Sequence, residues 1–301
     1  MGKKGRYQLI TRDTLMAYGF ILPAVLVFAV FMFYPLFYTV YLSLFDWNMI
    51  KPIKAFVGWK NYIAMFQDPL TYLVLKNTLA YIIILLVLNC AAPYALAFIL
   101  SFVIKRGREF YKSAFFLPSV ISLVVGSILY LWILNPVSGP VAIIAKFFGI
   151  AMPVWSKTQG LVIVVLSMIT TWKVFGYNFI VIFGGVSGVP REVIEAARID
   201  NVPPHRIFFD IVLPMSSATG IYIFIMTVVQ GLQYVFTPIK VVTQGGPDNA
   251  SSNAIYQVYQ EGFTLYHAGY ASAFAIVTMA LFVAMLILEF KYVEKGIYYE
   301  K

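Results

Sequence analysis

The dominant pattern along this chain is a series of long apolar runs separated by short polar stretches. A membrane-spanning helix needs roughly 20 mainly apolar residues, and each run reaches about that length. The runs are too continuously apolar for barrel strands, in which apolar and polar residues alternate. The pattern therefore predicts six spanning helices, at 14–45, 74–103, 113–134, 160–183, 215–238 and 268–290.

Composition supports the membrane as the solvent of this chain. Of its 301 residues, 61% are hydrophobic and 12% are charged, whereas soluble domains are about half apolar and a quarter charged. Only helices and closed barrels satisfy their backbone hydrogen bonds in lipid, so we expect an all-α polytopic membrane protein surrounded by lipid. The first apolar run is longer than that of a signal peptide, and we interpret it as a retained first span.

The positions of the basic residues predict the orientation. Lys and Arg favour cytoplasmic loops. With a cytoplasmic N-terminus, the inside segments are the N-terminal tail, 104–112, 184–214 and 291–301. Every arginine lies in one of them: Arg6, Arg12, Arg106, Arg108, Arg191, Arg198 and Arg206. Six spans then place both termini in the cytoplasm. We expect three parts: 1–72 (N-terminal tail, first span and first outer loop), 73–291 (five-helix core with a cytoplasmic segment at 184–214) and 292–301 (cytoplasmic tail).

The placement of the basic residues also argues against a nucleic-acid partner. The net charge of +9 is explained by basic residues in short loops that set the membrane orientation, so no nucleic-acid partner is predicted. The single cysteine, Cys90, excludes an internal disulfide. Neither His205 nor His267 has carboxylate or cysteine neighbours at ligand spacing, so no metal site is predicted.

The segment 184–214 is the most specific stretch of the sequence, and we call it the elbow. Pro190 suits the start of a helix, and Asn201 is able to adopt the left-handed conformation that ends one. Pro203 and Pro204 suit the start of a second helix. The elbow is therefore predicted to form two short helices about a sharp bend at the membrane surface.

A spaced motif runs through the elbow. Glu195-Ala196-Ala197 is followed by three residues and Asn201, and after nine more residues by Ile211, Leu213 and Pro214. This resembles the motif of ABC-importer permeases, E-A-A, three residues, G, nine residues, I-x-L-P. Asn201 replaces the glycine, and since asparagine tolerates a positive φ, we expect the bend to be kept.

The resemblance covers nearly the whole chain and is closest to the sugar-permease branch that serves maltose, lactose and glycerol-3-phosphate uptake. The residues that carry it include Leu22-Pro23, Tyr34-Pro35, Phe116-Leu117-Pro118, Trp172-Lys173, Gly176-Tyr177, Thr243 to Pro247 and Gly269 to Ala273. The resemblance implies the type I importer permease fold in a prokaryotic inner membrane. It also implies three kinds of partner: a second homologous permease subunit, two ATPase subunits, and an extracytoplasmic solute-binding protein.

By the same resemblance, the elbow is the coupling helix that docks on the ATPase. Its contact residues would be Glu195, Ala196, Ala197, Asp200, Asn201, Ile211, Leu213 and Pro214. The chain has no G-x-x-x-x-G-K-[ST] phosphate-binding loop. We therefore expect a non-catalytic subunit without a cofactor of its own, with ATP and Mg held by the partner ATPase.

Polar side chains within the spans are candidates for the substrate pathway. Thr170, Lys173 and Tyr177 share one face of the fourth span, and Thr227, Gln230 and Tyr234 repeat that spacing in the fifth, with Gln233 beside them. By resemblance, Thr170, Tyr177, Thr227 and Tyr234 match substrate-contacting positions of the maltose-type subunit. The alternative is that these residues only join helices. Lys173 could contact an anion or extend to the outer interface.

The predicted function is import of a di- or oligosaccharide by an ATP-driven permease. Glycerol-3-phosphate or another small anionic solute is the alternative cargo. A secondary transporter driven by an ion gradient is the alternative of a different class. Such a transporter would need carboxylates well inside the spans. Glu289 falls within the predicted span 268–290, but it lies close to the end of that span.

Overall fold

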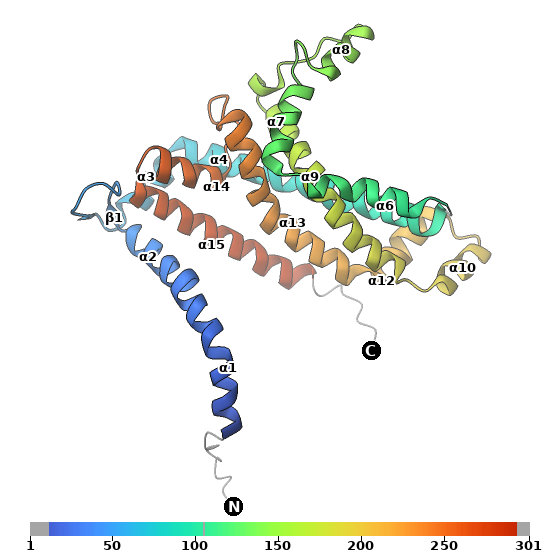
Figure 1. The fold of residues 1–301 in the computed structure, drawn as a ribbon, viewed down its shortest axis with the longest axis horizontal. Coiled ribbons are helices and arrows are strands. Elements are labelled where there is room, and N and C mark those ends of the chain that lie inside the picture. Colours follow the sequence, from blue (N-terminus) through green and yellow to red (C-terminus); the bar gives the residue numbers. More distant parts are fainter. Residues whose placement is uncertain (1–11, 105, 294–301) are drawn as a thin grey trace, which may run out of the picture.

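The protein is an elongated helical bundle from which two arms project (Figure 1). The structure, a computed structural model, describes residues 12–104 and 106–293. Long helical segments lie along the length of the bundle, at Pro69–Val103, Leu161–Ser187, Ser217–Thr243 and Ala268–Glu289. One arm is the first helix, which diverges from the bundle toward the N-terminus. The other arm carries α8 (Pro140–Phe147), which follows α7 (Leu123–Ile133) of the bundle, and points away on the opposite side.

The long helices match five of the six predicted spans. Candidate membrane spans run over Met16–Leu42, Pro69–Val103, Leu161–Ser187, Ser217–Thr243 and Ala268–Glu289. Their elements are α1 (Arg12–Phe28), α2 (Tyr34–Leu42), α4 (Pro69–Leu86), α5 (Ala92–Phe98), α9 (Leu161–Ser187), α13 (Ser217–Pro238) and α15 (Ala268–Val293). Short π-helical segments at Ala29–Phe33, Val87–Ala91, Ile99–Val103 and Ile239–Thr243 continue these helices without a break.

The third predicted span is not one straight helix. The run 113–134 is divided between α6 (Arg108–Phe116), a 3₁₀ turn at Leu117–Val120, and α7 (Leu123–Ile133), and the two parts are bent by 100°. Pro118 lies in the turn and Ile121 has an extended backbone, so helical hydrogen bonding stops there. The described residues thus contain five spanning helices, or six if the bent pair counts as one.

Shorter elements connect the long helices. They are the strands β1 (Phe45–Asp46) and β2 (Ala55–Phe56), which pair antiparallel, and the helices α3 (Lys60–Gln67), α8 (Pro140–Phe147), α10 (Arg191–Ile199), α11 (Pro204–Arg206), α12 (Leu213–Met215) and α14 (Ala254–Tyr259). Short helical turns lie at Trp155–Lys157, Ile207–Val212 and Gln260–Thr264.

Two apolar clusters hold the bundle together. One joins α4, α9 and α13 around Tyr81, Leu166 and Leu232. The other joins α5, α9 and the elbow around Phe179 and Ile207. Because α9 contributes to both clusters, it is the central helix against which the elbow and the remaining spans are positioned.

The loop before α14 is tied to the bundle by polar side chains of α4. The Asn77 side-chain amide donates to the carbonyls of Asn249 and Ser252, and the Tyr81 hydroxyl donates to the Ser251 carbonyl at 2.9 Å. Each buried donor thus has a partner, as burial of polar groups requires. Asn77 therefore joins structural elements.

Candidate functional site

The first half of the elbow is an amphipathic helix at one end of the bundle. In α10, Ile194 and Ala197 are buried against the second apolar cluster, while Glu195 and Ala196 are exposed. The helix carries Glu192 in its first turn and Arg198 in its last, which is the favourable arrangement for the helix dipole. The motif thus presents a charged and a small side chain to the outside.

The bend after α10 has the geometry of a Schellman motif. Asn201 adopts φ +55°. Its backbone N–H donates to the Arg198 carbonyl at 3.1 Å, and the Val202 N–H donates to the Ala197 carbonyl at 2.9 Å. Both bonds satisfy carbonyls that a helix end otherwise leaves free. The predicted left-handed conformation of Asn201 is therefore confirmed.

The second half of the elbow anchors the motif to the bundle. The chain is helical from Pro204 to Met215, and Ile207 and Val212 are buried. Ile211 and Leu213 pack on the same apolar cluster, whereas Asp200, Asn201 and Pro214 are exposed. The motif is therefore divided between anchoring residues and residues open to a partner.

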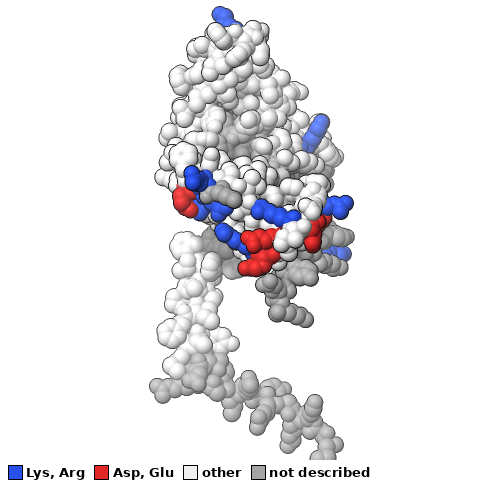
Figure 2. All heavy atoms as spheres, turned by 90° about the vertical axis from the view of Figure 1, so that its right-hand side faces the viewer, with Lys and Arg blue, Asp and Glu red and all other residues white. Residues whose placement is uncertain are grey.

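Charged side chains concentrate at the end of the molecule that carries the elbow (Figure 2). Basic and acidic residues lie side by side there, while the surface above them in that view is mostly uncharged. Such a band beside a mostly uncharged surface is typical of a membrane–water boundary.

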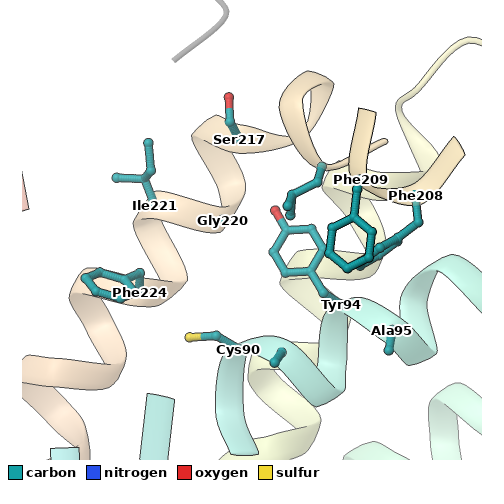
Figure 3. Close-up of a pocket in the computed structure, with 11 residues that line it drawn as sticks. Cys90, Tyr94, Ala95, Phe208, Phe209, Ser217, Gly220, Ile221 and Phe224 are labelled. Carbon is teal, nitrogen blue, oxygen red and sulfur yellow. The ribbon is translucent and has the colours of Figure 1, made fainter. Parts of the chain in front are cut away.

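An apolar pocket lies between the elbow and the bundle (Figure 3). It has a volume of about 630 Å³ and is lined by residues of α5, α13 and the second half of the elbow. The Tyr94 hydroxyl points toward Gly220 and donates to the Ser216 carbonyl at 3.0 Å. An added Cβ at Gly220 would lie 2.5 Å from that hydroxyl. The tyrosine therefore links α5 to the start of α13, where the elbow ends.

Two of the predicted pathway residues are buried between helices. Thr170 has no exposed surface and donates to the Leu166 carbonyl within its own helix. Thr227 is 6% exposed and accepts from the Asn178 amide at 3.3 Å. In this structure both hydroxyls make hydrogen bonds to other groups of the protein.

Lys173 lies at the break in the third span. Its ammonium donates to the carbonyls of Ser119 and Ile121, and the Ser119 hydroxyl donates back to the Lys173 carbonyl at 3.0 Å. These carbonyls have lost their helical partners at the turn. Lys173 thus stabilises the break.

The remaining predicted pathway residues form an exposed polar face together with one residue that sequence reasoning missed. The hydroxyls of Tyr177 and Tyr222 are 3.2 Å apart. Tyr177, Tyr222 and Tyr234 are 44%, 40% and 36% exposed, and Tyr234 lies near Tyr177. Gln230 is half-buried and Gln233 is exposed. We call these five residues the tyrosine face.

Helical spacing alone does not single out Tyr222. It lies eight residues before Gln230 and twelve before Tyr234 along α13, which at 3.6 residues per turn is roughly 80° and 120° around the helix. Only the fold shows that its hydroxyl meets that of Tyr177.

Comparison with known families decides to which family the chain belongs. Residues 105–297 match the model of the family described as "Binding-protein-dependent transport system inner membrane component". The chain belongs to this family. It is therefore an ABC-transporter permease subunit and a multi-pass inner-membrane protein, as the elbow motif predicted.

Curated relatives extend the match over almost the whole permease. This chain is 31% identical over 291 residues to the probable ABC transporter permease protein YurN of Bacillus subtilis, and the alignment covers 96% of this chain and 99% of the relative. It is 29% identical over 288 residues to the sn-glycerol-3-phosphate transport system permease protein UgpA of Brucella abortus, covering 95% and 97%.

Solved structures show the same fold. A bacterial ABC transporter that imports the acidic polysaccharide alginate superimposes with a TM-score of 0.78 at 19% identity, over 95% of this chain and 97% of the other. A second structure, of a bacterial alginate ABC transporter with its alginate pentasaccharide-bound periplasmic protein, gives 0.77 at 19% identity, over 95% and 96%. The permease fold predicted from sequence is confirmed.

Proposed function

We propose that this permease passes a neutral di- or oligosaccharide along the tyrosine face and is driven by separate ATPase chains that dock on the elbow. The observation that carries the proposal is the exposed set of Tyr177, Tyr222 and Tyr234 on facing helices α9 and α13. Phenol hydroxyls and flat rings offer hydrogen bonds and apolar surface together, which suits a sugar.

The position of Lys173 favours a neutral solute over glycerol-3-phosphate. UgpA relatives are named for that anionic solute. Lys173 is the cationic member of the predicted pathway set, and its ammonium is occupied by the Ser119 and Ile121 carbonyls. A phosphate on the tyrosine face would therefore meet hydroxyls and amides in place of that charge.

The elbow supports coupling to partner ATPases. Its exposed motif residues, Glu195, Ala196, Asp200, Asn201 and Pro214, stand at the charged end of the bundle. Small side chains there let a partner backbone approach closely. We assign ATP and Mg to the partner ATPase subunits and place the elbow and both termini in the cytoplasm.

The exposed first helix supports a second permease subunit as a partner. The most apolar window of Met16–Leu42 has none of its residues buried in this chain, and large apolar side chains such as Phe20 and Phe31 are exposed. Lipid and a homologous permease subunit together would cover this arm. The tail and first span (1–72) thus form one part, followed by the core (73–291) and a short tail (292–301).

The function is tested by transport into proteoliposomes that contain the complete transporter. The chain would be reconstituted with its second permease, its ATPases and its binding protein. Uptake of labelled maltose-type oligosaccharides and of glycerol-3-phosphate would then be compared. We expect saturable oligosaccharide uptake that requires ATP and the binding protein. Uptake of glycerol-3-phosphate alone would overturn the choice of solute, and uptake driven by an ion gradient without ATP would overturn the mechanism.

A further inference from the structure

Three arginines converge on a polar pocket that neither the elbow motif nor the tyrosine face explains. The pocket has a volume of about 380 Å³ and is lined mainly by polar groups. Arg191, Glu195 and Arg198 come from α10, Arg108 comes from the start of α6, and Ser101 and Phe102 come from the end of the second span. On α10 these residues share one face, which is turned toward the corner between the second and third spans.

Two of the three guanidinium groups, those of Arg108 and Arg198, are held in place by backbone carbonyls. Arg108 donates through Nε to the Ile104 carbonyl at 2.7 Å and through Nη2 to the Ser101 carbonyl at 3.0 Å. Arg198 donates through Nη2 to the Phe102 carbonyl at 2.7 Å. A carbonyl orients an arginine without neutralising it, so the positive charge of both side chains remains.

Acidic side chains do not balance this charge. The ion pair between lysine or arginine and a carboxylate that is found among the described residues joins Lys112 to Glu109, outside the pocket. The pocket is lined by one acidic residue, Glu195, and by three arginines, so positive charge is in excess. The pocket therefore offers several guanidinium donors to a ligand, and a phosphate group is an anion that guanidinium groups bind through paired hydrogen bonds.

The surroundings of the pocket indicate where that phosphate comes from. The pocket lies where one span ends and the next begins. Val103 and Phe110, adjacent in sequence to the pocket residues, are 57% and 72% exposed. Exposed apolar side chains beside an arginine pocket fit an amphiphile with acyl chains and an anionic head. Basic pockets between spans on the cytoplasmic side bind anionic lipid head groups.

We propose that this pocket binds the phosphate of an anionic phospholipid from the cytoplasmic leaflet. The proposal rests on the orientation given in the proposed function. The bound phosphate bridges Arg108 on α6 to Arg191 and Arg198 on α10. It thereby fastens the elbow to the corner of the bundle at the membrane surface, on the face of α10 that Glu195 shares.

The test measures lipid retention by the full-length chain, purified in detergent with the subunits that co-purify. Native mass spectrometry would count phosphatidylglycerol and phosphatidylcholine bound after incubation with equal amounts of each. The wild type should retain phosphatidylglycerol preferentially. Arg191→Gln removes a pocket charge for which no hydrogen bond to a described residue is present, so the fold is spared. It should weaken the preference about fivefold, the effect of one basic residue near a membrane surface.

The matched control is Arg206→Gln, which removes an exposed arginine from the other half of the elbow. Its lipid preference should equal that of the wild type. A preference that is equally reduced in both variants, or is absent in the wild type, overturns the proposal, since general surface charge would then explain retention.

Two further arms distinguish the alternatives. Inorganic phosphate alone, added at millimolar concentration, should not displace phosphatidylglycerol; complete displacement would assign the pocket to free phosphate and overturn the lipid source. If Arg191→Gln loses co-purifying ATPase while keeping its lipid preference, the pocket belongs to the protein partner and the proposal is wrong. Retention is measured without ATP or solute, so its failure is distinguishable from failure of the transport function.

Discussion

The ammonium of Lys173 lies 2.7 Å from the carbonyl oxygen of Ile121, and this contact joins the central helix α9 to the break in the third span. The sequence leaves open whether Lys173 contacts an anion or extends to the outer interface, and in the structure its ammonium donates to backbone carbonyls. The break redirects the chain into α7, which packs on α9 and α13 and leads to the arm that carries α8 (Figure 1), so Lys173 helps to fix the course of the third span.

Replacement of Lys173 by methionine should therefore destabilise the protein. The change keeps the length of the side chain but removes the hydrogen bonds to the part-buried Ser119 carbonyl and the exposed Ile121 carbonyl, and each hydrogen bond contributes about 0.5–1.5 kcal/mol. Thermal unfolding of the purified protein in detergent would show a lower midpoint. The control is Lys157→Met, at an exposed lysine of the loop before α9. Equal midpoints for the two variants would contradict the assigned role.

Gly176→Ala should disturb the packing of α6 on α9. An added Cβ would lie 2.2 Å from the Phe115 carbonyl oxygen, and backbone cannot yield as a flexible side chain does. Overpacking of this kind costs about 1–3 kcal/mol. Gly184→Ala is the matched control in the same helix, since nothing lies within 4 Å of its added Cβ. The unfolding midpoint should fall for the first variant alone, and an unchanged midpoint there would be evidence against this close contact.

The bend at Asn201 should accept glycine and reject valine. The residue has φ +55°, a conformation that costs a residue with an ordinary Cβ about 1–2 kcal/mol. Asn201→Gly should preserve stability and ATP-dependent uptake, whereas Asn201→Val should reduce both. Uptake and unfolding would be measured on the same preparations. A valine variant as active and stable as the glycine variant would show that the bend does not need a positive φ.

Removal of the Tyr222 hydroxyl should weaken solute recognition. In Tyr222→Phe one hydrogen bond is lost from the tyrosine face, and the KM for uptake should rise by about twofold to tenfold, which corresponds to one hydrogen bond. The maximal rate should change little, because uniform binding is lost. Tyr111→Phe, at an exposed tyrosine of α6, is the control. An unchanged KM in Tyr222→Phe would remove this residue from the pathway.

Much of this fold could be predicted from the sequence because lipid imposes strong constraints. Apolar length alone located five spans, and the left-handed residue of the elbow followed from Asn201 between two proline-started helices. The break in the third span could not be foreseen, because its stabilising contact joins residues 52 positions apart. Pro118 marks a place where the chain is able to change direction, but a proline fits a mild kink as well as a 100° bend, so the sequence does not give the size of the angle.

The candidate site was predictable in kind but not in detail. Helical spacing shows which residues share a face, but it does not show whether that face meets a neighbouring helix or an open surface. Thr170 and Thr227 are inside the bundle, whereas Tyr177 and Tyr234 are exposed. The arginine pocket also escaped sequence reasoning, since its members come from separate segments that only the fold brings together.

The central claim, that the elbow transmits ATP hydrolysis to the permease, is tested most directly by solute-stimulated ATPase activity of the reconstituted complex with Glu195→Lys. Glu195 is exposed on α10, so the reversal of charge should spare the fold and disrupt the contact with the ATPase. Glu109→Lys on α6 is the control, since Glu109 is also exposed and makes only a surface ion pair with Lys112. We predict that stimulation is abolished in Glu195→Lys and kept in the control. Stimulation at the wild-type level in Glu195→Lys, with the complex intact, would contradict the assignment.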